Sequence, residues 1–327
     1  MRAGKLPARA HAATDLDLNI TMLAYTIRRI LGAIPTLFVL VTLCFFMIRL
    51  APGGPFEGER NLPPQIKANL LEKYHMDQPL YKQYFSYLDN LLHGDLGPSF
   101  KFQDWTVNQL IAKGFPVSLK IGLWAMFWAA VLGLALGTVA ALRQNSWIDY
   151  VVMGLSMSGV SIPNFVTAPL MVLVFALMLH WLPAGGWGHG GLYNILLPII
   201  ALALPQIAII ARIMRGSMIE VLSSNYIRTA RAKGLSTRTI VLRHALRPSL
   251  TPVVSYLGPA MAAVLTGSVV IEQIFGLPGI GTIFVQSATN RDYTTVLGLV
   301  ILVGVLVVLF NIIVDILYAV IDPKIRY

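Results

Sequence analysis

Six long apolar stretches alternate with polar segments along this 327-residue chain. Each stretch reaches the minimum of about 17 residues that a helix needs to cross the hydrocarbon core of a bilayer. The pattern therefore predicts an all-α polytopic membrane protein with six transmembrane helices. The predicted spans cover residues 30–50, 117–142, 151–179, 195–212, 253–271 and 296–321.

The distribution of Lys and Arg predicts the orientation of these spans. Eight basic residues lie from Arg212 to Arg247, whereas residues 180–194 contain none and residues 273–295 contain only Arg291. Loops rich in Lys and Arg stay in the cytoplasm, and an even number of spans places both termini on one side, so both termini are predicted to be cytoplasmic. The predicted cytoplasmic segments are residues 1–29, 213–250 and 322–327, and the predicted outer segments are residues 51–116 and 273–295.

Composition agrees with a protein dissolved in lipid. Hydrophobic residues make up 56% of the chain and charged residues only 12%, which is unlike a soluble globular protein. The net charge of +10 does not indicate nucleic-acid binding, because Lys and Arg cluster beside the apolar spans, where topology and anionic lipid explain them. The single cysteine, Cys44, can form neither an internal disulfide nor a cysteine-based metal site.

Residues 51–116 form the longest segment outside the spans and are predicted to fold as a small helical cap. Turn-rich sequences, APGGP and HGDLGPS, lie near its two ends. Pro64 can open one helix and Pro79 another. The second helix is supported by apolar residues near helical spacing, namely Leu80, Tyr84, Tyr87, Leu88 and Leu91. A structured surface resting on the outer helix ends is favoured over a passive linker.

Polar side chains in the third span are candidates for a substrate pathway. Ser158, Ser161 and Asn164 lie near Pro163 and Pro169, so this helix can bend where its hydroxyl groups gather. Small hydroxyl residues also favour close packing between helices, and this alternative stays open.

Three further polar residues are weaker candidates for a pathway or a gate. Asp315 lies in the sixth span, where a central aspartate costs about 3 kcal/mol to insert, and Asn311 lies four residues earlier on the same face. Asp315 can line a conduit, clasp another helix, or reach the cytoplasmic surface. Glu272, at the outer end of the fifth span, can line an outer gate, but an interfacial glutamate needs no special role.

Several enzyme motifs are missing from the sequence. It contains no G-x-x-x-x-G-K-[ST] phosphate loop, no H-E-x-x-H and no G-x-S-x-G. Any ATP must therefore be hydrolysed by another chain, and an intramembrane hydrolase has no nucleophile and base in its favour. His180 and His189 share an outer loop without a nearby acid, so no metal site is predicted.

The basic segment 224–248 is predicted to form a helix-turn-helix elbow in the cytoplasm. Ser224 or Asn225 can cap a short helix through Lys233, and Gly234 suits the left-handed position after it. Leu235 can supply the apolar contact of this helix stop, and Ser236 can cap a second helix that carries Ile240, Val241 and Leu246. Charge alone would favour a loop that touches anionic lipid, but the capping pattern favours a rigid element.

This elbow resembles the coupling loop of permease subunits of binding-protein-dependent ABC importers. In that family the loop reads E-A-A, three residues, G, nine residues, I-x-L-P. With Gly234 on the family's glycine, Arg228, Thr229 and Ala230 occupy E-A-A, and His244, Leu246 and Arg247 occupy I, L and P. The acidic position is basic here and the proline comes one residue late, as is usual in the peptide and nickel branch of the family.

The resemblance to this branch covers nearly everything after Met22. It extends over IRRILGAIPTLFVL, LAPGGP, YHMDQPLYKQYFSYLDNLLHGDLGPS, IEQIFGLPGIG and RDYTTVLG. Within the branch the chain is most similar to a membrane subunit of oligopeptide importers, including GERNLPP and the ending YAVIDPKIRY.

The resemblance implies a type I importer permease in a bacterial inner membrane, which is not itself an enzyme and holds no cofactor. It implies a second related permease chain, two cytoplasmic ATPase subunits that bind ATP and Mg, and an external binding protein that delivers peptide. The residues implied to contact an ATPase are Asn225, Tyr226, Arg228, Thr229, Ala230, Arg231, Lys233, Gly234 and Leu235.

Two kinds of alternative remain. A gradient-driven secondary transporter or channel would use Asp315 as an ion or proton site, but the six spans show no convincing internal repeat in its support. Within the importer interpretation, dipeptide or nickel uptake are alternatives to oligopeptide uptake, because a wide conduit needs little residue-specific recognition.

Overall fold

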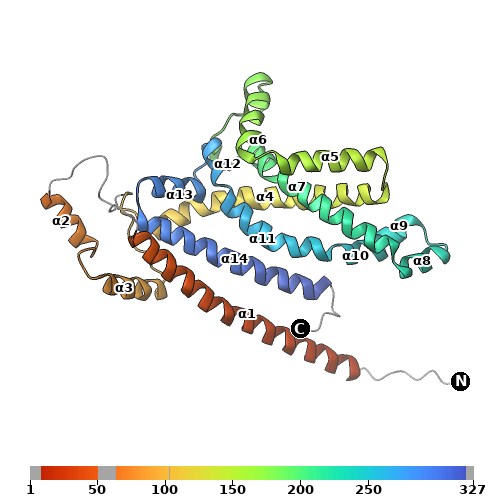
Figure 1. The fold of residues 1–327 in the computed structure, drawn as a ribbon, viewed down its shortest axis with the longest axis horizontal. Helices are drawn as coiled ribbons and strands as arrows, with labels where there is room; N and C mark the ends of the chain where they lie inside the picture. Colours follow the sequence, from red (N-terminus) through yellow and green to blue (C-terminus); the bar gives the residue numbers. More distant parts are fainter. Residues whose placement is uncertain (1–8, 51–63, 103, 322–327) are drawn as a thin grey trace.

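The computed structural model describes residues 9–50, 64–102 and 104–321 of the chain (Figure 1). These residues are helical except for turns, loops and one isolated antiparallel bridge between Pro98 and Thr106. The predicted all-α fold is confirmed.

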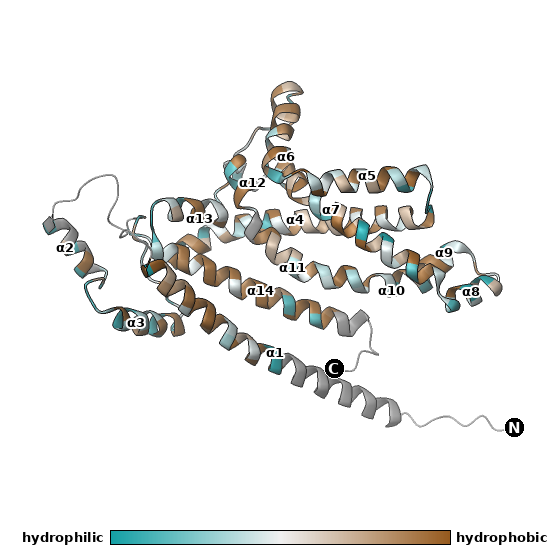
Figure 2. Cartoon of the chain, in the orientation of Figure 1, coloured by the Kyte–Doolittle hydropathy of each residue, from teal (hydrophilic) through white to brown (hydrophobic). Residues whose placement is uncertain are grey.

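Five helical segments of the described chain are long and apolar enough to cross a membrane, or six if one bent pair is counted as a span. The helices concerned are α1 (Arg9–Leu50), α4 (Val107–Leu142), α7 (Leu192–Ser223), α11 (Thr251–Gly267) with α12 (Val269–Ile274), and α14 (Tyr293–Ile321). Figure 2 shows that apolar residues dominate these helices, while hydrophilic residues gather near their ends.

Several helices extend beyond the apolar stretches that predict them. α1 begins at Arg9, so most of the predicted N-terminal tail continues the first span, because no Gly or Pro interrupts residues 9–31. α4 begins at Val107, ten residues before the predicted start, where Thr106 and Gln109 form a capping box. The predicted outer loop 273–295 contains a helix of its own, α13 (Ile280–Thr289).

The third predicted span is not a continuous helix. It divides into α5 (Trp147–Ser161) and α6 (Asn164–Met171), and a π-helical turn, Val172–Met178, follows α6. The two halves are bent by 104°, and α6 turns away from α5 in Figure 1. Pro163 causes the break, because proline lacks a backbone N–H and forces the preceding Ile162 into an extended conformation with ψ 117°.

The core lies where α4 and α7 pack along most of their length. Small residues make this approach possible: a Cβ added at Gly137 would lie only 2.5 Å from the carbonyl oxygen of Ala211. Buried Ala125 and Ala129 continue the same face of α4. The packing therefore depends on backbone contact between these two helices.

At one end of the bundle, α2 (Pro64–Lys73) and α3 (Leu80–Leu92) form the cap region of the chain. Tyr84 and Tyr87 of α3 pack on Phe45 of α1, and the Tyr84 hydroxyl lies 2.6 Å from Thr42 Oγ1. Burial raises the pKa of the Tyr87 hydroxyl. α3 is therefore fixed to the end of the first span.

A buried carboxylate holds the segment after the cap helices against α14. Asp292, which is fully buried, accepts hydrogen bonds from the Ser99 hydroxyl and from the Phe100 backbone N–H, the latter at 3.0 Å. It also accepts from the hydroxyl of Thr295 at 2.8 Å. One side chain thus joins the start of α14 to a segment far away in the sequence.

Candidate functional site

The elbow leaves the bundle at the end of α7. α8 (Asn225–Ala232) follows α7 after Ser224, and lies with α9 (Thr237–Thr239) at the end of the molecule opposite α2 and α3 (Figure 1). Ile227 and Ala230 are buried in the same apolar cluster as Met218 of α7 and Ile240. The elbow is therefore part of the main core.

A left-handed turn closes α8. Gly234 has φ +78°, its N–H donates to Arg231 O at 2.9 Å, and the Leu235 N–H donates to Ala230 O at 3.3 Å. These two bonds make a Schellman motif, as the position of the glycine predicts. A Cβ at Gly234 would meet no atom of this chain within 4 Å, so the local requirement for glycine here is conformational.

The second half of the elbow is a helix with a π-helical centre. α9 continues through Ile240–Ala245, which is π-helical, into α10 (Leu246–Ser249). Ser236 caps it by accepting from the Thr239 N–H at 3.4 Å, as predicted. Ser224 stands before α8 but does not cap it, because its hydroxyl instead donates to Val221 O at 2.6 Å.

The outward face of the elbow is polar and basic. Tyr226 is 49% exposed, and Arg228, Arg231 and Lys233 are exposed as well. The sequence from residue 224 to residue 248 holds no acidic residue that could balance these charges. Asn225, Thr229, Gly234 and Leu235 share the exposed surface, whereas Ala230 faces the core. The exposed set is suited to a partner with acidic or hydrogen-bond-accepting groups.

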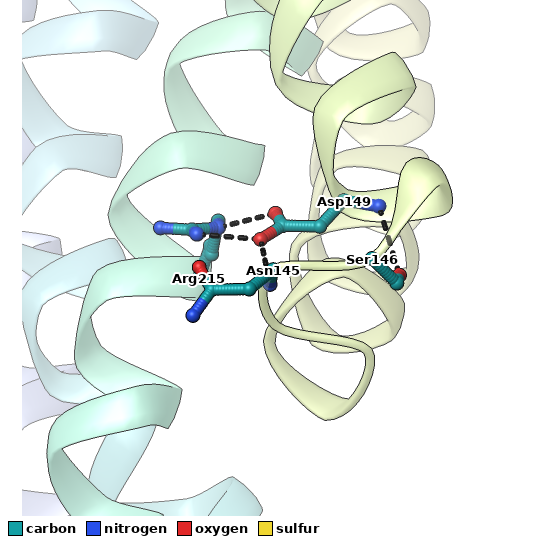
Figure 3. Close-up of polar contacts among 4 residues, drawn as sticks. All are labelled: Asn145, Ser146, Asp149 and Arg215. Atoms are coloured by element: carbon teal, nitrogen blue, oxygen red, sulfur yellow. Dashed lines mark hydrogen bonds and ion pairs between the residues drawn. The ribbon is translucent and has the colours of Figure 1, made fainter.

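A buried ion pair lies near the elbow and was not foreseen from the sequence. Asp149, which is 1% exposed, receives two hydrogen bonds from Arg215, at 2.5 Å from Nε and 2.6 Å from Nη2 (Figure 3). The Asn145 N–H donates to the same carboxylate at 2.9 Å. Arg215 belongs to α7 and Asp149 to the first turn of α5, so the pair joins these two helices. The only sequence signal is Ser146, which caps α5 three residues before the aspartate.

The polar residues of the third span lie around its break. Ser158 and Ser161 are exposed at the end of α5, and Asn164 is half-buried at the start of α6. The Ser158 hydroxyl donates to Gly154 O at 3.1 Å, within its own helix. Ser158 and Ser161 therefore lie on the exposed surface beside the break.

Glu272 is buried within the protein rather than exposed at the end of the fifth span. It is fully buried on α12, and its carboxylate accepts four hydrogen bonds. Two come from the hydroxyls of Ser118 and Ser268, both at 2.6 Å. Two come from the backbone N–H groups of Gly281, at 2.8 Å, and Thr282, at 3.1 Å. The carboxylate therefore caps the start of α13, where a helix favours negative charge.

Asp315 faces α1. Its carboxylate lies 3.1 Å from Nε of Arg29, so it clasps α14 to α1. Asn311 lies one turn earlier on α14, beside Arg28 and Arg29. The structure thus does not gather the six candidate residues into one site: three surround the break in the third span, one is buried under α13, and two face α1.

Comparison with known proteins identifies two matching families. Residues 133–327 match the family described as binding-protein-dependent transport system inner membrane component, and residues 22–121 match the N-terminal region of such components. The chain is 63% identical over 306 residues to the oligopeptide transport system permease protein OppB of Escherichia coli K12, covering 94% of this chain and 100% of the relative. It is 60% identical over 306 residues to OppB of Haemophilus influenzae, with the same coverage.

Among solved structures, the fold resembles a chain of the inward-facing MetNI methionine ABC transporter. The TM-score is 0.54 at 19% identity, over 65% of this chain and 97% of the other. At this identity the likeness concerns the fold alone.

Proposed function

This chain belongs to the family of inner membrane components of binding-protein-dependent transport systems, and on that premise we propose that it is a permease subunit of an ATP-driven importer of oligopeptides. The substrate class is supported by the identity of 60–63% to oligopeptide permeases along their whole length. The alternative is import of dipeptides or nickel, which can be tested by asking whether dipeptides or Ni²⁺ compete with the uptake of longer peptides.

The proposed mechanism rests on the structure of the elbow. Its outward face is exposed and basic, while Ile227 and Ala230 anchor its inner face in the same cluster as α7. A surface that is free on one side and rigidly packed on the other can transmit a force. We therefore assign α8 and Gly234 to contact with a cytoplasmic ATPase subunit, which would bind ATP and Mg in place of this chain.

The arrangement of the helices supports the predicted orientation. The elbow, the described start of α1 and the described end of α14 lie at one end of the molecule, opposite α2, α3 and α13 (Figure 1). With the basic elbow in the cytoplasm, both termini are cytoplasmic and the cap is external. In this orientation the cap would face the peptide-binding protein, and a second permease chain would complete the pathway.

Transport would follow from a change between two arrangements of the helices. Closure of the two ATPase subunits on ATP would move the elbow and favour an outward-open state, and ATP hydrolysis would restore the inward-open state.

The test uses the chain with the ATPase subunits that co-purify with it, reconstituted in vesicles with the binding protein and labelled peptides. We expect uptake that requires ATP and is competed by longer peptides rather than by dipeptides or Ni²⁺. Gly234→Asp is expected to abolish peptide-stimulated ATP hydrolysis, because it strains a left-handed position and puts a negative charge on the elbow. Normal stimulation in this variant would contradict the assignment of the elbow, and uptake without ATP would contradict the importer.

A further inference from the structure

A groove between α1 and α14 lies at the end of these helices that carries the elbow. It encloses a cavity of about 380 Å³, lined by Arg28, Arg29, Gly32, Ala33, Thr36, Val308, Asn311 and Ile312. The two helices touch farther along, where a Cβ at Gly304 would lie 2.6 Å from Leu40 Cδ2. A Cβ at Gly32 would meet nothing within 4 Å, so the groove is open beside this glycine.

The polar groups of the groove are cationic on balance. Arg29 pairs with Asp315 at 3.1 Å. Arg28 is exposed, and the part of the chain that the structure describes places no carboxylate within ion-pair distance of it. Arg28 therefore offers an exposed guanidinium group with which a phosphodiester can pair. The amide of Asn311 adds hydrogen-bonding capacity on the opposite wall.

The rest of the groove is lined by apolar groups. Val308 and Ile312 line one wall. Ala33 adds an apolar side chain on the wall formed by α1. A ligand that fits must therefore be amphipathic, with an anionic group near Arg28 and a hydrocarbon chain along the helices.

We propose that this groove binds a phospholipid with an anionic headgroup, from the leaflet on the side of the elbow. Basic pockets between transmembrane helices suit such headgroups, and each nearby Lys or Arg strengthens the attraction. The phosphate pairs with Arg28, while one acyl chain lies in the space that Gly32 leaves open. The bound lipid fills the gap between α1 and α14 that lies between the Leu40–Gly304 contact and the Arg29–Asp315 pair. This inference uses only the groove and does not depend on the proposed function.

The test is native mass spectrometry of the full-length chain, with any chains that co-purify, taken from nanodiscs of equal phosphatidylglycerol and phosphatidylcholine. We expect one phosphatidylglycerol retained in preference to phosphatidylcholine. Arg28→Gln should lower retention about fivefold, from the loss of one guanidinium–phosphate attraction, and Arg28→Lys should largely preserve it. Gly32→Leu should abolish retention by filling the groove, whereas Gly32→Ala should leave room for the lipid.

Matched controls separate this effect from general loss of structure. Arg143→Gln removes an exposed charge at the end of α4, and Gly154→Leu enlarges a helical glycine that has no neighbour within 4 Å. Neither should change lipid retention. Equal retention in the Gly32→Leu and wild-type chains would overturn the proposal, as would equal retention of the two lipids. Loss of binding to the partner permease in the Gly32→Leu variant would also overturn the proposal, because it would show that the groove is a contact between subunits.

Discussion

The buried carboxylate of Glu272 provides a sharp test of what fixes α13. In the Glu272→Ala variant, the four donors that the carboxylate satisfies would lose their acceptor. The hydroxyl of Ser268 can turn to Leu265 O, which lies 3.3 Å away. The N–H groups of Gly281 and Thr282 cannot turn, because they belong to the first turn of α13, where a helix offers them no acceptor.

The expected cost follows from these two N–H groups. Leaving a buried donor unsatisfied costs about 1–3 kcal/mol, so the Glu272→Ala variant should lose at least about this much stability from the buried Gly281 N–H, and less from the half-buried Thr282. Glu272→Gln should cost much less. Its amide oxygen can accept from Gly281 and Thr282, while its NH₂ group can donate to the hydroxyls of Ser118 and Ser268, which can rotate to accept. The glutamine variant would lose only the extra strength that the negative charge gives to these hydrogen bonds.

Thermal unfolding in detergent and amide hydrogen exchange would measure the effect. We expect a clear drop in midpoint temperature and faster exchange at residues 280–285 for the alanine variant, and small changes for the glutamine variant. Gln273→Ala, at an exposed neighbour on α12, is the matched control. If the glutamine variant lost as much stability as the alanine variant, the negative charge of Glu272 rather than its hydrogen bonds would hold α13. That result would refute this reasoning.

Three further predictions concern the elbow, the ion pair and the cap. Arg215→Ala should destabilise the protein by about 1.5–3 kcal/mol, measured by thermal unfolding, because the Asp149 carboxylate loses its charged hydrogen-bond donor and keeps only the Asn145 N–H. Gly234→Ala should cost about 1–2 kcal/mol of left-handed strain and weaken ATPase stimulation, whereas Gly216→Ala, in an open helical position, should not affect stimulation. Asp292→Ala should release the segment after the cap helices, so limited proteolysis should cleave near residues 98–102 faster than in the wild type.

Local chemistry allowed parts of this structure to be predicted from the sequence. The glycine after α8 and the serine before α9 both occupy the positions that their backbone preferences predict, because capping depends on a few neighbouring residues. Long apolar runs likewise identified the helices that can span a membrane. Pro163 marked the site of a bend, although its size of 104° depends on packing that the sequence does not reveal.

The buried polar contacts could not be predicted, because their partners are far apart in the sequence. Hydropathy places Glu272 at an interface because it treats residues 273–295 as a loop. In the structure, α13 folds back so that its N–H groups meet the carboxylate. The sequence shows that Asp315 is costly to insert into a membrane. It does not identify Arg29 as the partner, because this requires knowing that α1 and α14 are neighbours. A hydropathy pattern identifies helices, whereas the contacts between them decide what a buried charge does.

The contacts around α7 suggest how movement of the elbow could reach the break in the third span. α7 is one helix from Leu192 to Ser223, and the pair of Arg215 with Asp149 makes α5 follow it. The end of α5 also packs on α7, since a Cβ at Gly159 would lie 3.4 Å from Ala208 Cβ. α6 follows α5 after the break at Pro163, and its Ala168 and Met171 are buried in the same apolar cluster as residues of α7. We propose that a force on the elbow moves α7, α5 and α6 together, and with them Ser158, Ser161 and Asn164 around the break.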